Sequence, residues 1–238
     1  MDAAKYKVLS GAVLQMRRLE LVSRNLANLN TSGYKRDGLA FSEILVGSLN
    51  QRNRIGGMVG IADQRTDFSQ GQFQQTGNPF DLAIEGDGFF VIQTPRGIRY
   101  TRQGTFTLSG DGTVVTPQGY ALMGESSPIR VEGKDLEVTQ EGAVLSDGGE
   151  VGNIRVVRFS DLSLLIKEGN SFFHSPQVEP EDASAFRIHQ GTLEQSNVNP
   201  IEAMVTLILI QRRFEAYQRA LRVMDGATEK MISEGARL

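Results

Sequence analysis

Apolar residues near the C-terminal end of the chain repeat at alternating spacings of four and three. The repeat passes through Ala203, Leu207, Ile210, Phe214, Tyr217, Leu221, Met224, Thr228 and Met231. These are the spacings of the a and d positions of a coiled coil, so they predict a long helix whose single apolar seam needs a partner helix. Asn199 suits an N-cap and Pro200 the first helical position, which places the expected helix from there to about residue 234.

The other end of the chain supplies a matching stripe. Its positions, at spacings of three and four, are Leu9, Ala12, Met16, Leu19, Ser23 and Leu26. We expect one helix over about residues 3–29, ending in the run from Asn28 to Gly33, because Asn and Gly tolerate the left-handed conformation at helix ends. The two ends of the chain are therefore predicted to pair as helices.

Between these helices the apolar pattern changes. Residues 35–75 are polar and rich in Gly, with Gly56-Gly57 at their centre, and we interpret them as an extended connector, partly disordered in the free chain. A short apolar cluster within the connector fits either a strand or a helical turn; it comprises Leu39, Phe41, Ile44 and Leu45. From about Phe80 to Phe186, short β-rich runs alternate with turn residues, and Asp111-Gly112 is a strong hairpin signal.

The expected fold class is α+β, with terminal helices pairing as a coiled coil around a central antiparallel β-rich domain. Residues 1–34 and 195–238 form the predicted helical domain. Residues 35–75 form the predicted connector, and residues 76–194 the predicted β-rich domain.

Composition narrows the functional classes. The 238 residues contain 26 Gly but no Cys, which excludes disulfides, a thiol nucleophile and thiolate metal ligands. No run of about 18 apolar residues predicts a membrane span, and the first residues lack the apolar core of a cleaved secretory signal. The overall charge of −3 is uneven, because residues 1–36 hold seven Lys or Arg against two acidic residues. That basic arm lacks clusters and interleaved aromatics, so a solvated helix face is favoured over nucleic-acid binding.

No catalytic, cofactor or metal constellation stands out. Gly86-Asp87-Gly88 resembles the start of a dinucleotide fingerprint, but Val91 replaces the third Gly and no βαβ pattern follows, so a turn is favoured. His174 and His189 lack metal-binding spacing. Asn30-Thr31-Ser32 matches a glycosylation triplet at chance level. We therefore expect no enzyme, no cofactor and no metal.

Three motif blocks carry a more specific signal. The first spans residues 23–28 with Thr31, Gly33, Tyr34, Lys35 and Arg36. The second spans residues 77–90 and 100–106. The third spans residues 196–200 with Glu202, Met204, Gln211-Arg212, Phe214-Glu215 and Asp225. In this order and spacing they resemble the flagellar rod and hook family of bacteria. Within it, the runs at residues 199–204 and 213–216 and the modest length look most like proximal rod proteins, with distal rod proteins next.

The resemblance implies a structural subunit that assembles helically with other rod proteins into the hollow drive shaft carrying torque to the hook. It also implies passage through the flagellar type III export apparatus without a cleaved signal, a periplasmic place in the basal body, and terminal helices lining the channel. An alternative is a distal rod or hook subunit. A soluble adaptor or capping protein with its helices in a closed bundle is a further alternative.

The residues proposed for these roles fall into two sets. The assembly seam, within and between subunits, comprises Leu9, Met16, Leu19, Leu26, Leu207, Ile210, Phe214, Tyr217, Leu221 and Met224. Helix capping and the crossing to the β domain are assigned to Asn25, Asn28, Gly33, Asn197, Asn199 and Pro200. The alternative for the same seam is an ordinary two-helix core within a monomer. The two interpretations overlap, because one face of the seam can pair within the chain while other faces meet neighbours.

Overall fold

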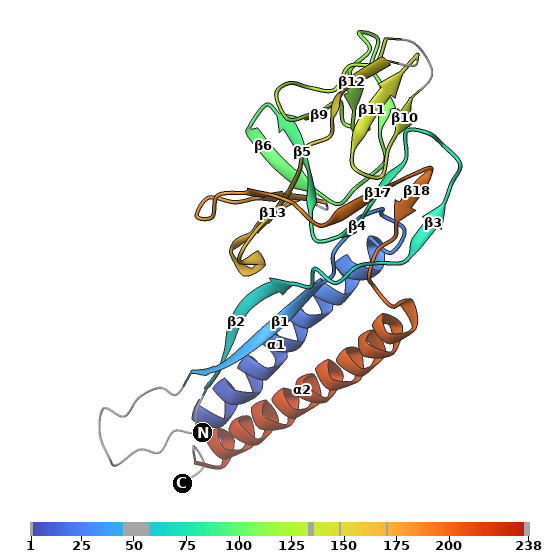
Figure 1. Cartoon of the computed structure of the whole chain (residues 1–238). Helices are drawn as coiled ribbons and strands as arrows, with labels where there is room; N and C mark the ends of the chain where they lie inside the picture. The colour runs from blue at the N-terminus through green and yellow to red at the C-terminus, as the bar shows by residue number, and fades with distance from the viewer. Residues whose placement is uncertain (1, 45–57, 133–135, 148, 170, 236–238) are drawn as a thin grey trace. The chain divides into compact units, whose positions relative to one another are not determined.

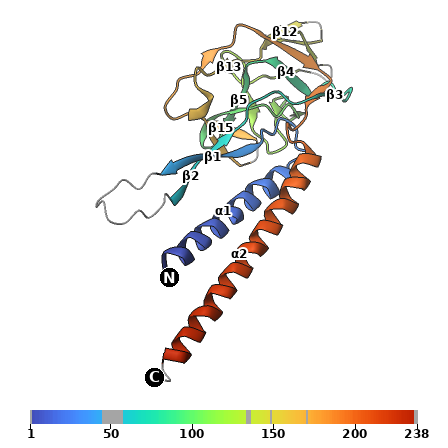
Figure 2. The same cartoon turned by 90° about the horizontal axis from the view of Figure 1, so that it is seen from below.

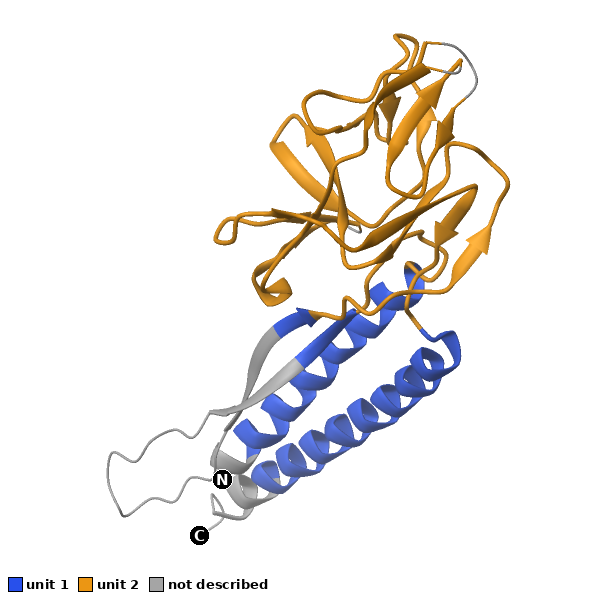
Figure 3. Ribbon diagram, in the orientation of Figure 1, with its two compact units in different colours: residues 1–27, 37–65, 199–238 blue, residues 28–36, 66–198 orange. Residues whose placement is uncertain are grey.

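The computed structural model describes residues 2–44, 58–132, 136–147, 149–169 and 171–235, with side chains from 5–39 and 64–229 within those ranges. The chain divides into two compact units (Figure 3). The helical unit comprises residues 1–27, 37–65 and 199–238, and the β unit comprises residues 28–36 and 66–198.

Two antiparallel helices dominate the helical unit. The helices α1 (Asp2–Ala27) and α2 (Pro200–Gly235) lie side by side in Figures 1 and 2. Lys5, early in α1, forms an ion pair of 2.9 Å with Asp225, late in α2. Gly11 faces the Tyr217 ring so closely that an added Cβ would lie 2.7 Å from two ring carbons. Both contacts place the start of α1 beside the end of α2.

The predicted connector contributes a two-stranded sheet. Strands β1 (Asp37–Ile44) and β2 (Met58–Thr66) pair with each other, so the apolar cluster at residues 39–44 belongs to a strand and not to a helical turn. Leu45 and Gly56-Gly57 lie outside the described residues. The Asn25 side chain holds the start of β1 to α1, because its Oδ1 accepts from Asp37 N at 2.9 Å and its Nδ2 donates to Asp37 O at 2.8 Å.

The β unit consists of short antiparallel strands. In chain order they are β3 (Phe73–Gln75), β4 (Leu82–Gly86), β5 (Phe89–Thr94), β6 (Gly97–Thr101), β7 (Thr107–Leu108), β8 (Val114–Val115), β9 (Ala121–Leu122), β10 (Glu137–Val138), β11 (Ala143–Ser146), β12 (Gly149–Asn153), β13 (Val156–Arg158), β14 (Ile166–Glu168), β15 (Phe172–His174), β16 (Glu181–Asp182), β17 (Phe186–Gln190) and β18 (Thr192–Glu194). A 3₁₀ turn, η1 (Leu162–Leu164), precedes β14.

The largest sheet of the β unit has the order β14-β15-β6-β5-β9-β8-β7, and β13 pairs with both β5 and β16. Three smaller sheets are β10-β11-β12, β17-β4 and β18-β3. Asp111-Gly112 forms the turn between β7 and β8, as its hairpin signal predicts. Gly112 adopts φ +81° there, a value that favours glycine.

Strand β5 lies between two apolar clusters. Phe90 and Ile92 belong to one cluster, with Leu82 and Ile188, while Phe89 and Val91 belong to the other, with Phe173. Side chains alternate across a strand, so an uninterrupted apolar run such as residues 89–92 is typical of a strand buried on both faces. The predicted α+β class with antiparallel sheets is therefore confirmed.

The boundaries of the units differ from the predicted domains. Residues 28–34 and 195–198 belong to the β unit, and the predicted connector is shared between the two units. The reason is burial, which periodicity does not reveal. Tyr34 and Lys35 are almost fully buried within the β unit, and residues 28–36 are bonded to segments far away in the sequence.

Candidate assembly interface

The predicted seam on α2 coincides with its least exposed face. Ile210 is buried, and the other seam positions proposed on this helix are partly buried: Leu207, Phe214, Tyr217, Leu221 and Met224. The seam residues Ala203 and Thr228 are partly buried as well. The Met231 side chain lies outside the described residues.

The seam positions on α1 separate into two groups. Leu19 and Leu26 are partly buried, whereas Leu9 and Met16 are each 49% exposed. The buried apolar positions of this helix are Ala12 and Leu21. Leu9 and Met16 therefore lie on a face that the described residues leave largely uncovered.

Two exposed apolar stripes follow from this arrangement. The α1 stripe comprises Tyr6, Leu9, Val13 and Met16, and the α2 stripe comprises Ile201, Met204, Val205, Ile208 and Leu209. The α2 stripe has the spacing of an amphipathic helix face, yet it differs from the seam that α2 buries. The first turns of α2 are thus apolar on two faces. The predicted seam includes only one of these faces, although the apolar run at residues 204–210 also indicates the second.

A groove adjoins the α2 stripe within the helical unit. It is a cavity of about 220 Å³ between α1, the start of β1 and α2. Its apolar lining includes Leu21, Leu39 and Ile210. Its charged lining includes Arg18 and Arg213. Leu209 belongs to both the groove and the α2 stripe, so the two form one continuous apolar surface.

The start of α2 is capped locally. Asn199 Oδ1 accepts hydrogen bonds from the backbone of Ile201 at 3.0 Å and of Glu202 at 3.2 Å, and Pro200 is the first residue of the helix. This satisfies two of the amide groups that every helix N-terminus leaves unpaired. Glu202 adds a negative charge in the first turn, where the helix dipole favours one.

The remaining motif residues act inside the β unit. Asn28 Oδ1 accepts from the Thr31 hydroxyl at 3.2 Å, and Gly33 takes φ +66°. Asn197 caps no helix. Its Oδ1 accepts from Arg36 N at 2.7 Å, and its Nδ2 donates to Asp67 O at 2.8 Å. Asn197 thus holds together segments that are distant in sequence.

A buried charge cluster lies beside these residues. Lys35 Nζ and Glu194 Oε1 are 2.6 Å apart with both side chains 1% exposed, and Arg102 Nη1 lies 3.5 Å from Glu194 Oε2. Burial lowers the pKa of Lys35, and the charge of Glu194 opposes that shift. Periodicity does not mark a buried lysine, so the sequence pattern does not predict this cluster.

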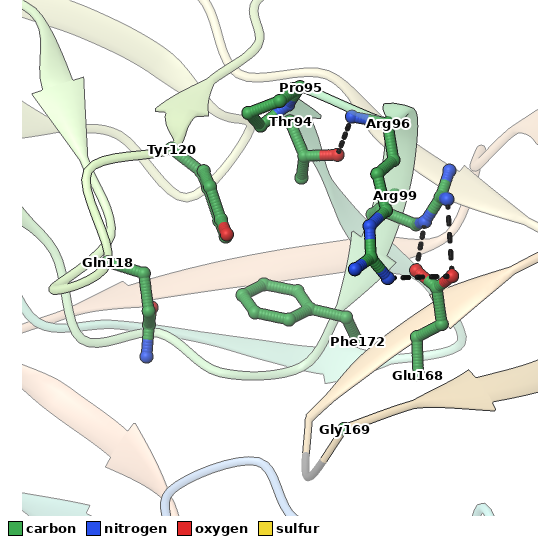
Figure 4. Close-up of a pocket in the computed structure, with 9 residues that line it drawn as sticks. All are labelled: Thr94, Pro95, Arg96, Arg99, Gln118, Tyr120, Glu168, Gly169 and Phe172. Atoms are coloured by element: carbon green, nitrogen blue, oxygen red, sulfur yellow. Dashed lines mark hydrogen bonds and ion pairs between the residues drawn. The ribbon is translucent and has the colours of Figure 1, made fainter.

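A second cavity, of about 290 Å³, lies within the β unit where three turns converge (Figure 4). Arg99 lines one side: its Nε and Nη2 lie 2.5 and 3.3 Å from the Glu168 carboxylate, and its Nη1 donates to Ile98 O. The Arg99 hydrogen bond and charge lower the pKa of Glu168. This pair fastens the β14–β15 turn to β6.

The described ranges hold no group of three or more His, Cys, Asp or Glu side chains arranged for a metal ion. None of the helices in those ranges combines the length and the apolar content that a membrane span requires.

Comparison with protein families gives matches along most of the chain. Residues 8–35 match the family described as flagella basal body rod protein, and residues 83–146 match the flagellar hook protein FlgE/F/G D1 domain. Residues 189–234 match the flagellar basal body rod FlgEFG protein C-terminal family. The three matches correspond in order to the three motif blocks.

Individual relatives cover the full length. The flagellar basal-body rod protein FlgF of Caulobacter vibrioides is 34% identical over 100% of this chain and 98% of its own. FlgF of Mesorhizobium japonicum is 31% identical over 98% and 97%, and the rod protein FlgG of Borreliella burgdorferi is 29% identical over 94% and 96%. The chain therefore belongs to the family of flagellar basal-body rod proteins, which are structural and not enzymatic, and within it is similar to FlgF first and FlgG next.

Proposed function

We propose that this rod protein is a proximal-rod subunit, joined to its neighbours mainly through the helical unit, in a hollow shaft that transmits torque from motor to hook. The observation that carries the proposal is the pair of exposed apolar stripes on α1 and α2. Contiguous apolar surface on a soluble chain typically marks an interaction site. Covering a half-exposed apolar side chain is worth about 1 kcal/mol, so nine of them supply a substantial driving force for association.

The helix lengths support a coiled coil that continues between subunits. The 36-residue α2 is longer than the 26-residue α1. Because Lys5 pairs with Asp225, the last turns of α2 lie beyond the start of α1, while the heptad repeat continues to Met231. The part of the α2 seam that extends beyond α1 can pack against a helix of a neighbouring subunit.

The two stripes also favour an open assembly. They differ in residues and lie on different helices, so a contact between the α1 stripe of one subunit and the α2 stripe of the next is heterologous. Heterologous contacts that do not close into a ring generate helical filaments. This geometry disfavours the closed bundle of an adaptor or capping protein.

The partners follow from the family. Rod proteins assemble with other rod subunits in the basal body, and we extend this to the proximal and distal rod proteins as neighbours of this chain. Passage through the flagellar type III export apparatus without a cleaved signal, and a periplasmic position in the rod, complete the proposal. Their support is the family resemblance.

The proposal is tested by making the α1 stripe polar. Leu9→Gln with Met16→Gln changes two side chains that are exposed in the single subunit, so the purified variant should keep the helix content and melting temperature of the wild type. It should fail to restore swimming in cells that lack their own copy, because burial against the neighbouring subunit is lost. Basal bodies isolated from those cells should lack the subunit.

A matched control changes the polar side of the same helix. Arg17→Gln with Glu20→Gln also leaves the net charge unchanged and removes only an exposed ion pair of 3.2 Å, which is worth little. This control should swim normally. Normal swimming and rod incorporation by the Leu9→Gln, Met16→Gln variant would show that the α1 stripe is no assembly surface.

A further inference from the structure

Two segments of the β unit, residues 33–36 and 194–197, run side by side in the same direction. Gly33 N donates to Glu194 O at 2.7 Å, and Asn197 N donates to Tyr34 O at 3.4 Å. Arg36 N donates to the Asn197 side chain at 2.7 Å. Because residue numbers rise together along both segments, the pairing is parallel.

A third segment, residues 67–69, is bonded to both. The Asn197 amide donates to the carbonyls of Asp67 and Ser69 at 2.8 and 3.1 Å. Lys35 Nζ donates to the same Ser69 carbonyl at 2.8 Å, and the Arg36 guanidinium lies 2.9 Å from the Asp67 carboxylate. Asn197 is thus bonded to both of the other segments.

The centre of this arrangement is shielded from water. Lys35 and Glu194 are each 1% exposed, and the Tyr34 ring is fully buried with Lys167 Nζ 3.9 Å from its centroid. Water competes poorly for hydrogen bonds at such a site, and the low local dielectric strengthens the bonds that are made. The parallel segments are therefore joined by a dry, charged core as well as by backbone contacts.

The three segments lie at the points where the chain enters and leaves the β unit. The chain passes between the units next to residues 28, 36, 66 and 198 (Figure 3). Each of these ends of the β unit lies in one of the three bonded segments or within five residues of one. Load that reaches the β unit along the backbone therefore enters at or beside these segments.

We propose that residues 33–36, 67–69 and 194–197 form a mechanical clamp that lets the β unit bear load delivered through the terminal helices. Pulling residue 28 away from residue 198 draws two parallel segments along each other from opposite ends. In that geometry the bonds share the load and must break together. In an antiparallel pair pulled at one end, the bonds break one at a time and resist less.

The load itself rests on the proposed torque-bearing function, but the clamp can be tested on the isolated chain. Because the chain has no Cys, Ala27→Cys and Ile201→Cys provide the only attachment points for single-molecule force measurements. At constant force across these points, Asn197→Ala should raise the unfolding rate of the β unit about tenfold or more, since it removes the side-chain hydrogen bonds that join Asn197 to residues 36, 67 and 69.

A second pulling direction separates a mechanical role from a loss of stability. Handles at two exposed residues, Gly110 in the β7–β8 turn and Glu150 on β12, load the β unit away from the clamp. Asn197→Ala should leave that unfolding rate nearly unchanged. Val144→Ala, which shortens a buried side chain of β11, should act mainly in this second direction. A variant at Asn197 that alters both directions equally, or neither, would overturn the clamp.

A gentler variant covers the case in which Asn197→Ala does not fold. Asn197→Asp keeps an acceptor for Arg36 N and loses the donations to Asp67 and Ser69, so it should give a smaller rise confined to the same direction. These measurements use monomers. If the force measurements contradict the clamp, the proposed assembly surface on the helices is unaffected. If the α1 stripe proves not to be an assembly surface, the proposed clamp is unaffected.

Discussion

Gly33 shows how narrow the choice of residue is where the chain enters the β unit. Its φ of +66° is one that residues with a Cβ rarely adopt. An added Cβ would also lie 2.2 Å from the carbonyl carbon of Arg102, closer than any packing allows. The sequence predicted a helix-terminating role from the residue type alone. The close approach of a distant backbone segment is a separate requirement, which no local pattern contains.

Replacing Gly33 with Ala should therefore destabilise the β unit strongly. We expect a loss of roughly 3 kcal/mol or more in the free energy of unfolding, since the backbone around Arg102 must move. Urea denaturation followed by aromatic fluorescence measures this loss. Gly77→Ala is the matched control, because Gly77 has φ +74° but an added Cβ meets nothing within 4 Å. Gly77→Ala should lower the free energy of unfolding by about 1 kcal/mol, the cost of placing a residue with a Cβ at positive φ. Equal losses would show that the contact with Arg102 is unimportant.

At the scale of elements, α2 has two apolar faces, and the heptad pattern predicts only one of them. The seam positions of α2 are buried or partly buried, and a single apolar row along a helix is a local property of the sequence. The second apolar face at residues 201–209 matters only once the structure shows that nothing in the described residues covers it. On α1, Leu9 and Met16 fit the heptad equally well but lie on the exposed side.

The β14–β15 turn gives a prediction at the same scale. Its Glu168 is paired with Arg99, which holds the pKa of the carboxyl below its ordinary value of 4.5. The stability gained from this pair is complete above that ordinary value and is lost as the pH falls through the lowered pKa. Glu168→Gln should therefore lower the melting temperature at neutral pH and flatten its decline below about pH 4.5.

Melting curves of the two proteins at a series of pH values test this expectation. Glu150→Gln, which changes an exposed carboxyl on β12, serves as the control and should follow the wild-type curve. If the melting temperatures of the wild type and of Glu168→Gln fall in parallel as the pH is lowered, another carboxyl group controls the loss of stability in acid.

For the whole molecule, the division into units predicts how the isolated subunit is digested. The terminal helices carry exposed apolar faces, whereas the β unit holds two clusters of buried apolar side chains, so the helices should open more readily than the β unit. Limited proteolysis should leave a core whose outer limits lie near residues 28 and 198, as intact-mass measurement will show. Residues 28–36 should remain attached even after a cut elsewhere, because Tyr34 and Lys35 are buried there.

A contrasting fragment sharpens this test. Residues 76–194, the predicted β-rich domain, lack Tyr34, Lys35 and Asn197 and should fold poorly when expressed alone. Residues 28–198 should fold cooperatively. A stable, cooperatively melting 76–194 fragment would refute the view that the flanking segments are part of the β unit.

The sequence by itself determined the class of fold, the two terminal helices, the antiparallel β core and, through three motif blocks, the family. These features depend on patterns within short windows or on motifs preserved in order, which physical periodicity and turn chemistry explain. The boundaries of the units and the roles of Lys35, Glu194 and Asn197 were decided only by the tertiary structure. Each of these residues is partnered across more than thirty positions of chain, and a contact between distant segments leaves no periodic mark on either of them.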